Sequence, residues 1–157
     1  MWWPTIKPAS YYTFASGALG WNAPAAVGIA LAQQKSGTGR PVVAVIGDGS
    51  LQYSVQCLAS AAQHKLKVIY VIPCNGEYAI LKEFAVLENT PNVPALDLPA
   101  LDIVSTAKGF GSAAVEARTR QEIQAAFSKA LETDGPTVIA IPIKHQIRPL
   151  VPPVSVA

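Results

Sequence analysis

The chain has 157 residues, of which 50% are hydrophobic and 14% are charged, and its formal net charge is +2. These values predict one domain with enough chain to bury a core, and the lack of any block of basic residues argues against nucleic-acid binding. No stretch approaches about 18 consecutive apolar residues and the first residues lack the regions of a signal peptide, so we expect no membrane span and a cytoplasmic protein.

The first half of the chain predicts alternating helices and strands. Residues 1–10 hold two prolines and no hydrophobic periodicity, so we expect an irregular arm, followed by a tight apolar turn at residues 17–20. Beyond this turn we expect a helix, a strand, a helix, a strand and a helix, at about residues 23–34, 42–46, 54–64, 67–72 and 78–87. Pro24 suits the start of a helix, and Asn89 with Pro91 suits the end of one.

The second half begins with a loop at residues 90–99, which contain three prolines. We then expect a helix, a strand, a helix and a strand, at about residues 103–108, 112–116, 120–132 and 137–143. Asp102 is the expected cap of the first helix, and Thr119 with Glu122 forms a capping-box pattern before the second. The alternation predicts an α/β fold for residues 11–143, with an open, mostly parallel sheet flanked by helices on both faces, and a proline-rich tail at residues 144–157.

Two oxygen-bearing side chains stand where predicted strands end. Asp48 lies in the turn Gly47-Asp48-Gly49-Ser50, directly after the first strand, and Asn75 follows the second strand. The carboxyl ends of parallel strands line the crevice where such sheets bind ligands. Carboxylate and amide oxygens suit Mg²⁺ or Ca²⁺, and glycine N–H groups at the start of a helix suit a diphosphate. The sequence therefore predicts a site for a divalent cation and a diphosphate.

Each of these signals also has an explanation that involves no ligand. Asp-Gly after a strand is common turn chemistry, so the GDGS turn alone is weak evidence, although its combination with Asn75 is stronger. The turn at residues 17–20 can be a glycine turn that packs on a helix, and the apolar side chains of the 78–87 helix can be its core face.

The order GDGS, then Asn-Gly after about one βαβ unit, resembles the thiamine diphosphate motif of the superfamily of 2-oxo acid decarboxylases and acetolactate synthases. Further segments follow in the order seen in benzoylformate decarboxylases, and the resemblance covers about residues 8–143. These segments are Ser10-Tyr11-Tyr12, Gly17-Ala18-Leu19-Gly20, Pro24-Ala25-Ala26-Val27-Gly28, Asn75-Gly76-Glu77-Tyr78, Asn92-Val93-Pro94-Ala95-Leu96-Asp97 and Ala107-Lys108-Gly109-Phe110-Gly111.

The resemblance implies a role for each candidate site residue. Mg²⁺, or alternatively Ca²⁺, would be held by the side chains of Asp48 and Asn75 and by the main-chain oxygen of Glu77. The residues implied in binding thiamine diphosphate are Gly17, Leu19, Gly47, Gly49, Ser50 and Tyr78. The residues implied in the apolar wall of the substrate pocket are Ile80, Leu81 and Phe84.

Three positions depart from the family pattern. Glu77 stands where a small residue, often Thr, is usual, and its carboxylate could weaken diphosphate binding. Cys74 stands where many relatives have an additional Asn. Ile80 is larger than the residue that best suits an aromatic substrate, which leaves room for a smaller or branched aliphatic 2-oxo acid.

The implied function is the C-terminal cofactor-binding domain of a decarboxylase that converts benzoylformate to benzaldehyde and carbon dioxide. The family's activating glutamate belongs to a pyrimidine-binding domain, so we expect no catalytic residue in this chain and no activity from it alone. The low charged fraction predicts surfaces that another domain or subunit covers. The resemblance implies that this partner is the pyrimidine-binding domain, in the same or a neighbouring subunit of a homo-oligomer. A subunit of a split decarboxylase, an acetolactate synthase-like domain and a non-catalytic interaction module are the alternatives.

Overall fold

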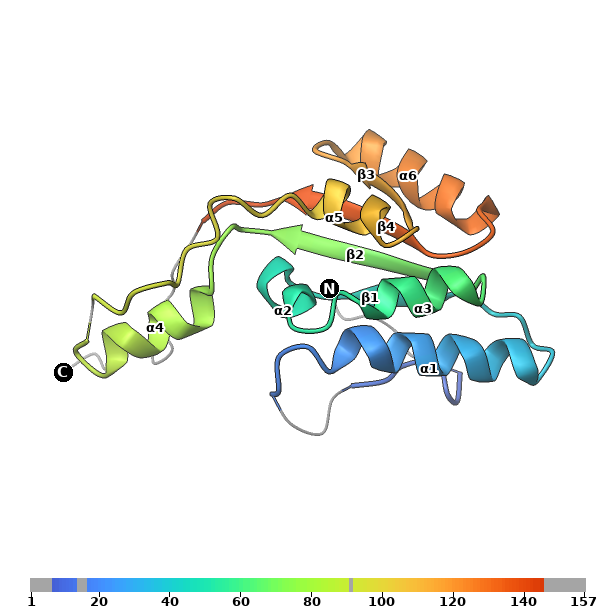
Figure 1. Cartoon of the computed structure of the whole chain (residues 1–157), viewed down its shortest axis with the longest axis horizontal. Helices are drawn as coiled ribbons and strands as arrows, with labels where there is room; N and C mark the ends of the chain where they lie inside the picture. Colours follow the sequence, from blue (N-terminus) through green and yellow to red (C-terminus); the bar gives the residue numbers. More distant parts are fainter. Residues whose placement is uncertain (1–6, 14–16, 91, 146–157) are drawn as a thin grey trace.

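One parallel β-sheet organises the chain in a computed structural model, which describes residues 7–13, 17–90 and 92–145 (Figure 1). Within these residues the sheet has four strands in the order β1-β2-β4-β3. Their bounds are Val42–Val45 for β1, Val68–Cys74 for β2, Ala113–Glu116 for β3 and Thr137–Pro142 for β4. Every neighbouring pair is parallel, so the carboxyl ends of β1 and β2 meet at one edge of the sheet.

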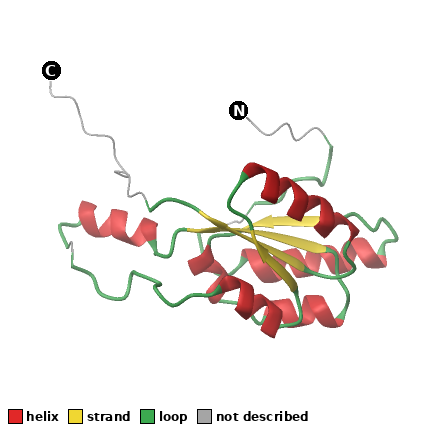
Figure 2. Cartoon of the chain, turned by 90° about the horizontal axis from the view of Figure 1, so that it is seen from above, coloured by secondary structure: helices red, strands yellow, loops and turns green. Residues whose placement is uncertain are grey.

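Helices cover both faces of this sheet (Figures 1 and 2). The helices are α1 Asn22–Lys35, α2 Asp48–Gln52, α3 Cys57–Gln63, α4 Ala79–Leu87, α5 Ile103–Gly109 and α6 Arg120–Glu132. α1, α3 and α5 contribute to the hydrophobic cluster on one face, whereas α6 packs on the other. The predicted α/β fold, with helices on both faces of an open parallel sheet, is confirmed.

The alternation of side chains along β2 explains why the sheet has two apolar faces. Val68, Tyr70 and Ile72 belong to the cluster with α1 and α3, while Ile69 and Val71 face α6. Tyr70 is fully buried, and its hydroxyl donates a hydrogen bond of 3.3 Å to the carbonyl of Ala23 in α1. A buried phenol needs such an acceptor, so this bond fixes α1 on the sheet as well as satisfying Tyr70.

The predicted helix at residues 54–64 corresponds to α3, which begins three residues later, at Cys57, and the short helix α2 precedes it, separated from it by tight turns. In these turns the N–H of Tyr53 bonds to the carbonyl of Ser50, and the N–H of Cys57 bonds to the carbonyl of Ser54. Both bonds span three residues, as in a 3₁₀ helix. The hydroxyl of Ser54 donates to the carbonyl of Gly20 at 2.6 Å, a long-range contact that draws the chain out of a single straight helix.

β2 continues through Pro73 and Cys74, although we expected the strand to end at Ile72. The carbonyl of Val71 bonds to the N–H of Ile46 on the β1 side, and the carbonyl of Cys74 bonds to the N–H of Ile143 on the β4 side. Because successive backbone groups alternate, Pro73 faces the β1 side just beyond the end of that strand. Its missing N–H therefore costs no hydrogen bond of the sheet.

α4 lies apart from the other helices, beyond the carboxyl end of β2 (Figures 1 and 2). Only Ala85 of this helix is buried, although most of its residues are apolar. The predicted end of the helix at Asn89 is confirmed, because Asn89 adopts the left-handed conformation with φ 54°, whereas Pro91 lies outside the described residues. The predicted loop follows it and returns to the turn after β2 through a bridge between Glu77 and Asp97. Among the described residues, no helix combines the length and the apolarity that a membrane crossing requires.

Candidate functional site

The carboxylate of Asp48 joins the ends of β1 and β2. Asp48 is the first residue of α2 and is only 4% exposed. Its Oδ1 accepts a hydrogen bond from the N–H of Gly49 at 2.9 Å, and its Oδ2 accepts one from the N–H of Gly76 at 2.8 Å. Gly76 directly follows Asn75, so the structure brings the neighbourhoods of the two predicted metal ligands together.

The turn that carries Asn75 is shaped by its own side chain. Asn75 is half-buried, and its Oδ1 accepts from the N–H of Glu77 at 3.3 Å. Gly76 between them has φ 69°, a left-handed conformation that favours glycine. This conformation directs the Gly76 N–H to Asp48, so the turn and the carboxylate hold one another.

Gly49 makes room for the ring of Tyr78. A Cβ added to Gly49 would lie 2.6 Å from Cε1 of Tyr78 and 3.4 Å from Cδ1 of Leu98. The same ring meets Tyr53 edge-on, with 6.3 Å between ring centroids. In contrast, a Cβ added to Gly47 would meet nothing within 4 Å. Of these two predicted cofactor-binding glycines, Gly49 is the one at which the close packing excludes a side chain.

The turn at residues 17–20 is tied to the start of α2. The N–H of Gly20 donates to Oγ of Ser50 at 3.1 Å, and Ser54 bonds to the Gly20 carbonyl. Gly17 and Leu19 are therefore brought to the side of the sheet where Asp48 lies, and Leu19 keeps 38% of its surface exposed. Because the Ser50 hydroxyl acts only as an acceptor in this bond, its proton is still available to a ligand.

Cys74 is the last residue of β2 and directly precedes Asn75. Burial raises the pKa of its thiol to about 11, and the neighbouring negative charge of Asp48 adds to the effect. A thiol with this pKa is neutral at physiological pH, and a neutral thiol is a poor nucleophile and metal ligand. Cys74 therefore acts as a packing residue beside the site.

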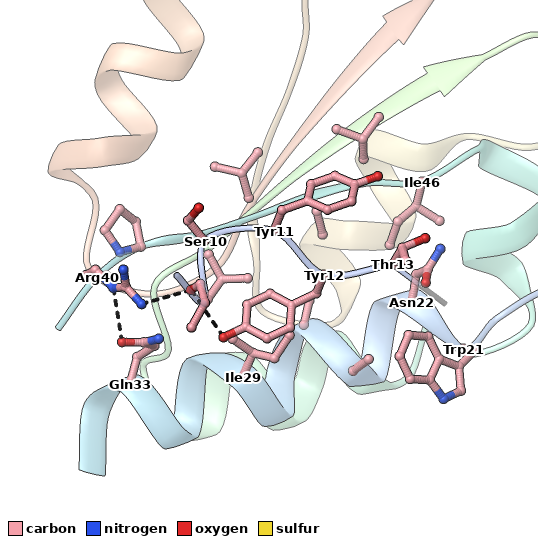
Figure 3. A pocket seen from close by; sticks show the side chains of 18 residues that line it. Ser10, Tyr11, Tyr12, Thr13, Trp21, Asn22, Ile29, Gln33, Arg40 and Ile46 are labelled. Atoms are coloured by element: carbon pink, nitrogen blue, oxygen red, sulfur yellow. Dashed lines mark hydrogen bonds between the residues drawn. The ribbon is translucent and has the colours of Figure 1, made fainter. Parts of the chain in front are cut away.

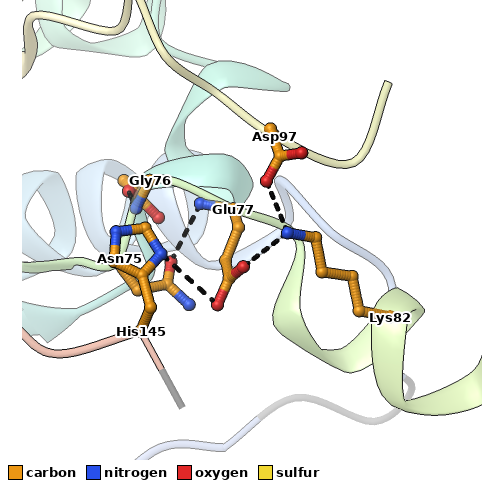
Figure 4. Close-up of polar contacts among 7 residues, drawn as sticks. Asn75, Gly76, Glu77, Lys82, Asp97 and His145 are labelled. Carbon is orange, nitrogen blue, oxygen red and sulfur yellow. Dashed lines mark hydrogen bonds and ion pairs between the residues drawn. The ribbon is translucent and has the colours of Figure 1, made fainter. Parts of the chain in front are cut away.

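A cluster of charged groups surrounds the side chain of Glu77 (Figure 4). Glu77 is buried, and its Oε2 lies 2.6 Å from Nζ of Lys82, which also contacts Asp97. His145 lies on the other side, with Nδ1 3.6 Å from Oε1 of Glu77. Sequence reasoning missed Lys82, Asp97 and His145. Asp97 belongs to a segment that carries the family resemblance, but nothing in the sequence places any of the three beside Glu77, because the fold of the loop and the end of β4 bring them there.

The three residues predicted to form a substrate pocket all lie on α4 and are exposed: Ile80 by 45%, Leu81 by 39% and Phe84 by 48%. The described part of the chain supplies no opposite wall for them. A cavity with a volume of about 450 Å³ lies elsewhere (Figure 3). It opens along β1 and is lined by Tyr11, Tyr12 and Trp21 among others, and none of the predicted site residues lines it.

Comparison with known proteins identifies the family. The family described as thiamine pyrophosphate enzyme, C-terminal TPP binding domain, matches residues 1–141. The chain belongs to this family. The predicted resemblance to the thiamine diphosphate enzymes is thereby confirmed.

Benzoylformate decarboxylases and acetolactate synthases are among the relatives of this TPP binding domain. A benzoylformate decarboxylase of Pseudomonas aeruginosa is 42% identical over 136 residues, which are 87% of this chain and 25% of that protein. The acetolactate synthase isozyme 1 large subunit of Escherichia coli is 28% identical over 155 residues, 96% of this chain and 27% of that protein. The crystal structure of benzoylformate decarboxylase from Polynucleobacter necessarius superposes with a TM-score of 0.87 at 52% identity, over 92% of this chain and 27% of that one. The chain thus spans about a quarter of the length of these relatives.

The geometry of this TPP binding domain is compatible with a magnesium ion and a diphosphate. Each carboxylate oxygen of Asp48 accepts one N–H, and an ionised carboxylate offers about four lone-pair sites, so both oxygens can still bind a cation. Asn75 and the main chain of Glu77 carry neutral oxygens on the turn that the Gly76 N–H ties to Asp48, and carboxylate, amide and carbonyl oxygens are the donors that hard divalent cations prefer. Ser50, at the start of the same helix as Asp48, adds a hydroxyl whose proton is still available to a ligand.

Proposed function

We propose that this chain is the C-terminal cofactor-binding domain of a thiamine diphosphate- and Mg²⁺-dependent, non-oxidative 2-oxo acid decarboxylase. Benzoylformate is the proposed substrate, and benzaldehyde and carbon dioxide are the products. The observation that carries the proposal is the hydrogen bond from the Gly76 N–H to the buried Asp48 carboxylate, because it joins the two predicted halves of a metal site. The relatives named benzoylformate decarboxylase, at 42% and 52% identity, support the choice of reaction.

Each residue has a defined task in this proposal. Asp48 and Asn75, with the main-chain oxygen of Glu77, hold Mg²⁺, and Ca²⁺ would suit the same oxygens. The diphosphate is bound by the backbone at Gly47, Gly49 and Tyr78 and by the hydroxyl of Ser50, and the turn with Gly17 and Leu19 receives the aminopyrimidine ring. Mg²⁺ would neutralise part of the diphosphate charge. The cofactor would thus be held at its diphosphate end by the metal site and at its aminopyrimidine end by the turn.

Thiamine diphosphate supplies a nucleophilic carbon and an electron sink, which the loss of carbon dioxide from a 2-oxo acid requires. The chain itself contributes orientation and an apolar surface. Ile80, Leu81 and Phe84 expose that surface on α4, beside the turn that holds the metal ligands. Once another domain covers them, they would exclude water from the substrate, and Ile80 narrows the space available to an aromatic ring.

The remaining parts of the enzyme lie outside this chain in our proposal. A pyrimidine-binding domain, in the same or a neighbouring subunit of a homo-oligomer, supplies the activating glutamate and covers α4. An acetolactate synthase-like domain is the second candidate, because the Escherichia coli relative aligns with 96% of the chain. Turnover of benzoylformate by the isolated chain, with Mg²⁺ and cofactor added, would contradict the proposal that a second domain is needed.

Calorimetric titration with thiamine diphosphate tests the proposed site. We expect binding that requires Mg²⁺ and that Asp48→Asn weakens by about 100-fold, the effect of losing one metal-site partner. Asp134→Asn is the matched control, since Asp134 lies in an exposed turn away from the site. Binding that is indifferent to Mg²⁺, or equal in Asp48→Asn and Asp134→Asn, contradicts the assignment. Failure to bind even with the pyrimidine domain supplied would favour a non-catalytic module.

A further inference from the structure

Two acidic residues face each other across the bridge that closes the loop over the site. Glu77 and Asp97 are antiparallel partners. On either side of them, the N–H of Tyr78 bonds to the carbonyl of Leu96 and the N–H of Leu98 bonds to the carbonyl of Gly76, both at 2.8 Å. Such a pair has its side chains on the same side and close together, and like charges at these positions are destabilising.

One cation offsets this repulsion. Lys82 comes from the first turn and a half of α4, and its ammonium group contacts Oε2 of Glu77 at 2.6 Å and Oδ1 of Asp97. The hydrogen bonds to Asp97 and then to Glu77 raise the pKa of Lys82, so the group carries its charge throughout the physiological range. Three segments, the turn after β2, the returning loop and α4, thus meet at one ammonium group (Figure 4).

The burial of Glu77 makes this cation necessary. The Glu77 side chain is 4% exposed, whereas that of Asp97 is 73% exposed. Within the described part of the chain, Oε1 of Glu77 has no hydrogen-bond partner, because Nδ1 of His145 at 3.6 Å is too distant to donate. A buried carboxylate that loses its counter-charge is strongly destabilising, so the turn depends on Lys82 more than an exposed ion pair would allow.

The loop held in this way reaches the candidate cofactor site. Leu98 lies next to the space at Gly49, and the bonded N–H of Tyr78 belongs to the residue whose ring fills that space. Movement of the loop would therefore also move the turn that carries Asn75 and the Glu77 main chain.

We propose that Lys82 is a positioning residue, which neutralises Glu77 and Asp97 together and so locks the loop at residues 92–98 onto the turn at residues 75–78. The lock fixes the oxygens of Asn75 and of the Glu77 main chain for the divalent cation. It also explains how this chain accommodates a carboxylate at position 77, since the counter-charge comes with it. The part of this inference that concerns the cation rests on the proposed function.

Hydrogen exchange of the full chain tests the lock without any ligand. In Lys82→Met we expect the amides of Tyr78 and Leu98 to exchange about tenfold faster or more, as the loss of a charged hydrogen-bond partner predicts. Amides of β4 should keep their rates. Lys82→Arg should stay near the unmodified rate, and Lys129→Met, which removes an exposed lysine of α6, should change neither amide.

Charge removal separates this role from simple packing. In the triple variant Glu77→Gln, Asp97→Asn, Lys82→Met there is no repulsion left to offset, so exchange at Tyr78 and Leu98 should return most of the way to the unmodified rate. If the triple variant exchanges as fast as Lys82→Met, or if Lys82→Met exchanges at the unmodified rate, the lock does not exist.

Mg²⁺-dependent binding of thiamine diphosphate then tests its consequence. We expect Lys82→Met to raise the Kd about tenfold, about 1.4 kcal/mol, and Lys82→Arg to restore it. Faster exchange with an unchanged Kd overturns the positioning role. If the unmodified chain shows no such binding, it is the proposed function that fails, and the exchange rates of the same variants still decide whether Lys82 holds the loop.

Discussion

The two glycines on either side of Asp48 have different surroundings. Gly49 faces the ring of Tyr78 so closely that an added Cβ would overlap it, whereas Gly47 has open space and an ordinary φ of −64°. The structure therefore requires glycine at position 49 for packing. At position 47 packing within the described structure does not require glycine, so only a ligand or another domain that approaches the turn could restrict the residue there.

Alanine at each position separates these requirements. We expect Gly49→Ala to lower the free energy of unfolding by about 1–3 kcal/mol, because Tyr78 must move out of a filled space. Gly47→Ala should leave it within about 0.5 kcal/mol or raise it slightly, since its backbone conformation suits any residue. Urea denaturation followed by circular dichroism measures both. Equal losses in the two variants would show that the Tyr78 contact is unimportant.

Sequence reasoning at the residue scale identified the groups that follow strands and missed those that arrive from loops. Asp48 and Asn75 could be paired because parallel strands bring their carboxyl ends together whatever the details of packing. Lys82 could not be placed beside Asp97, because their approach depends on the path of a proline-containing loop. His145 belongs to the predicted tail, and the structure places its imidazole near Gly76 and Glu77, just after β4, with 68% of the side chain still exposed.

At the scale of elements, the local capping pattern predicted the bounds of α6 closely, whereas the bounds of α2 and α3 depend on contacts with residues distant in the sequence. The capping box of Thr119 and Glu122 is present in both directions, and the helix runs over Arg120–Glu132 as expected. The division between α2 and α3 was not predicted, because it accompanies a bond from Ser54 to Gly20, which is distant in the sequence. The extension of β2 through Pro73 was missed for the same kind of reason, since it depends on where β1 ends.

The cap of α6 can be tested directly. We expect Thr119→Ala to lower the free energy of unfolding by about 1 kcal/mol, because the N–H of Glu122 loses its acceptor. Thr119→Ser keeps a hydroxyl in the same place and should cost much less. Thermal unfolding of the three proteins under one set of conditions provides the comparison. A serine variant as unstable as the alanine variant would point to the lost methyl group instead of the cap.

The isolation of α4 from the sheet predicts that its apolar residues contribute little to folding. Phe84→Ser should change the free energy of unfolding by less than about 1 kcal/mol, since nearly half of the side chain is already exposed. Leu58→Ala in α3 is the contrast: this side chain is fully buried, and its truncation should cost about 2–5 kcal/mol. Chemical denaturation measures both values. A loss of several kcal/mol in Phe84→Ser would mean that α4 packs on the body of the chain.

At the scale of the whole molecule, the free energy of unfolding should decrease at acidic pH, because two carboxylates that cap helices become protonated. Backbone N–H groups lower the pKa of Glu122 from its ordinary 4.5, and hydrogen bonds from Ser105 lower the pKa of Asp102 from its ordinary 3.8. A folded-state pKa below the unfolded value means stabilisation that is present above that value and is lost as the pH falls. Melting temperatures between about pH 6 and pH 3 should therefore decline. Glu122→Gln, which retains the cap without a titrating group, should decline less, and an identical slope in the two proteins would contradict this assignment.

On the alkaline side, stability should depend on the half-buried thiol of Cys74, whose pKa is raised. Burial, then the charge of Asp48, raises the pKa of Cys74 from 9.0 to about 11. The unfolded chain can ionise this thiol at a pH where the folded chain cannot, so the stabilisation is complete below pH 9.0 and is lost as the pH rises towards about 11. Burial also raises the pKa of Cys57, so Cys57→Ala should affect the alkaline part of the stability profile in the same direction as Cys74→Ala. In Cys74→Ala, the free energy of unfolding should decrease less steeply above about pH 9.0 than in the unmodified protein, whatever the stability of the variant at neutral pH. Because tyrosines ionise from about pH 10 upward, the onset of the decline is the informative quantity, and an onset unchanged by Cys74→Ala would assign it to another group.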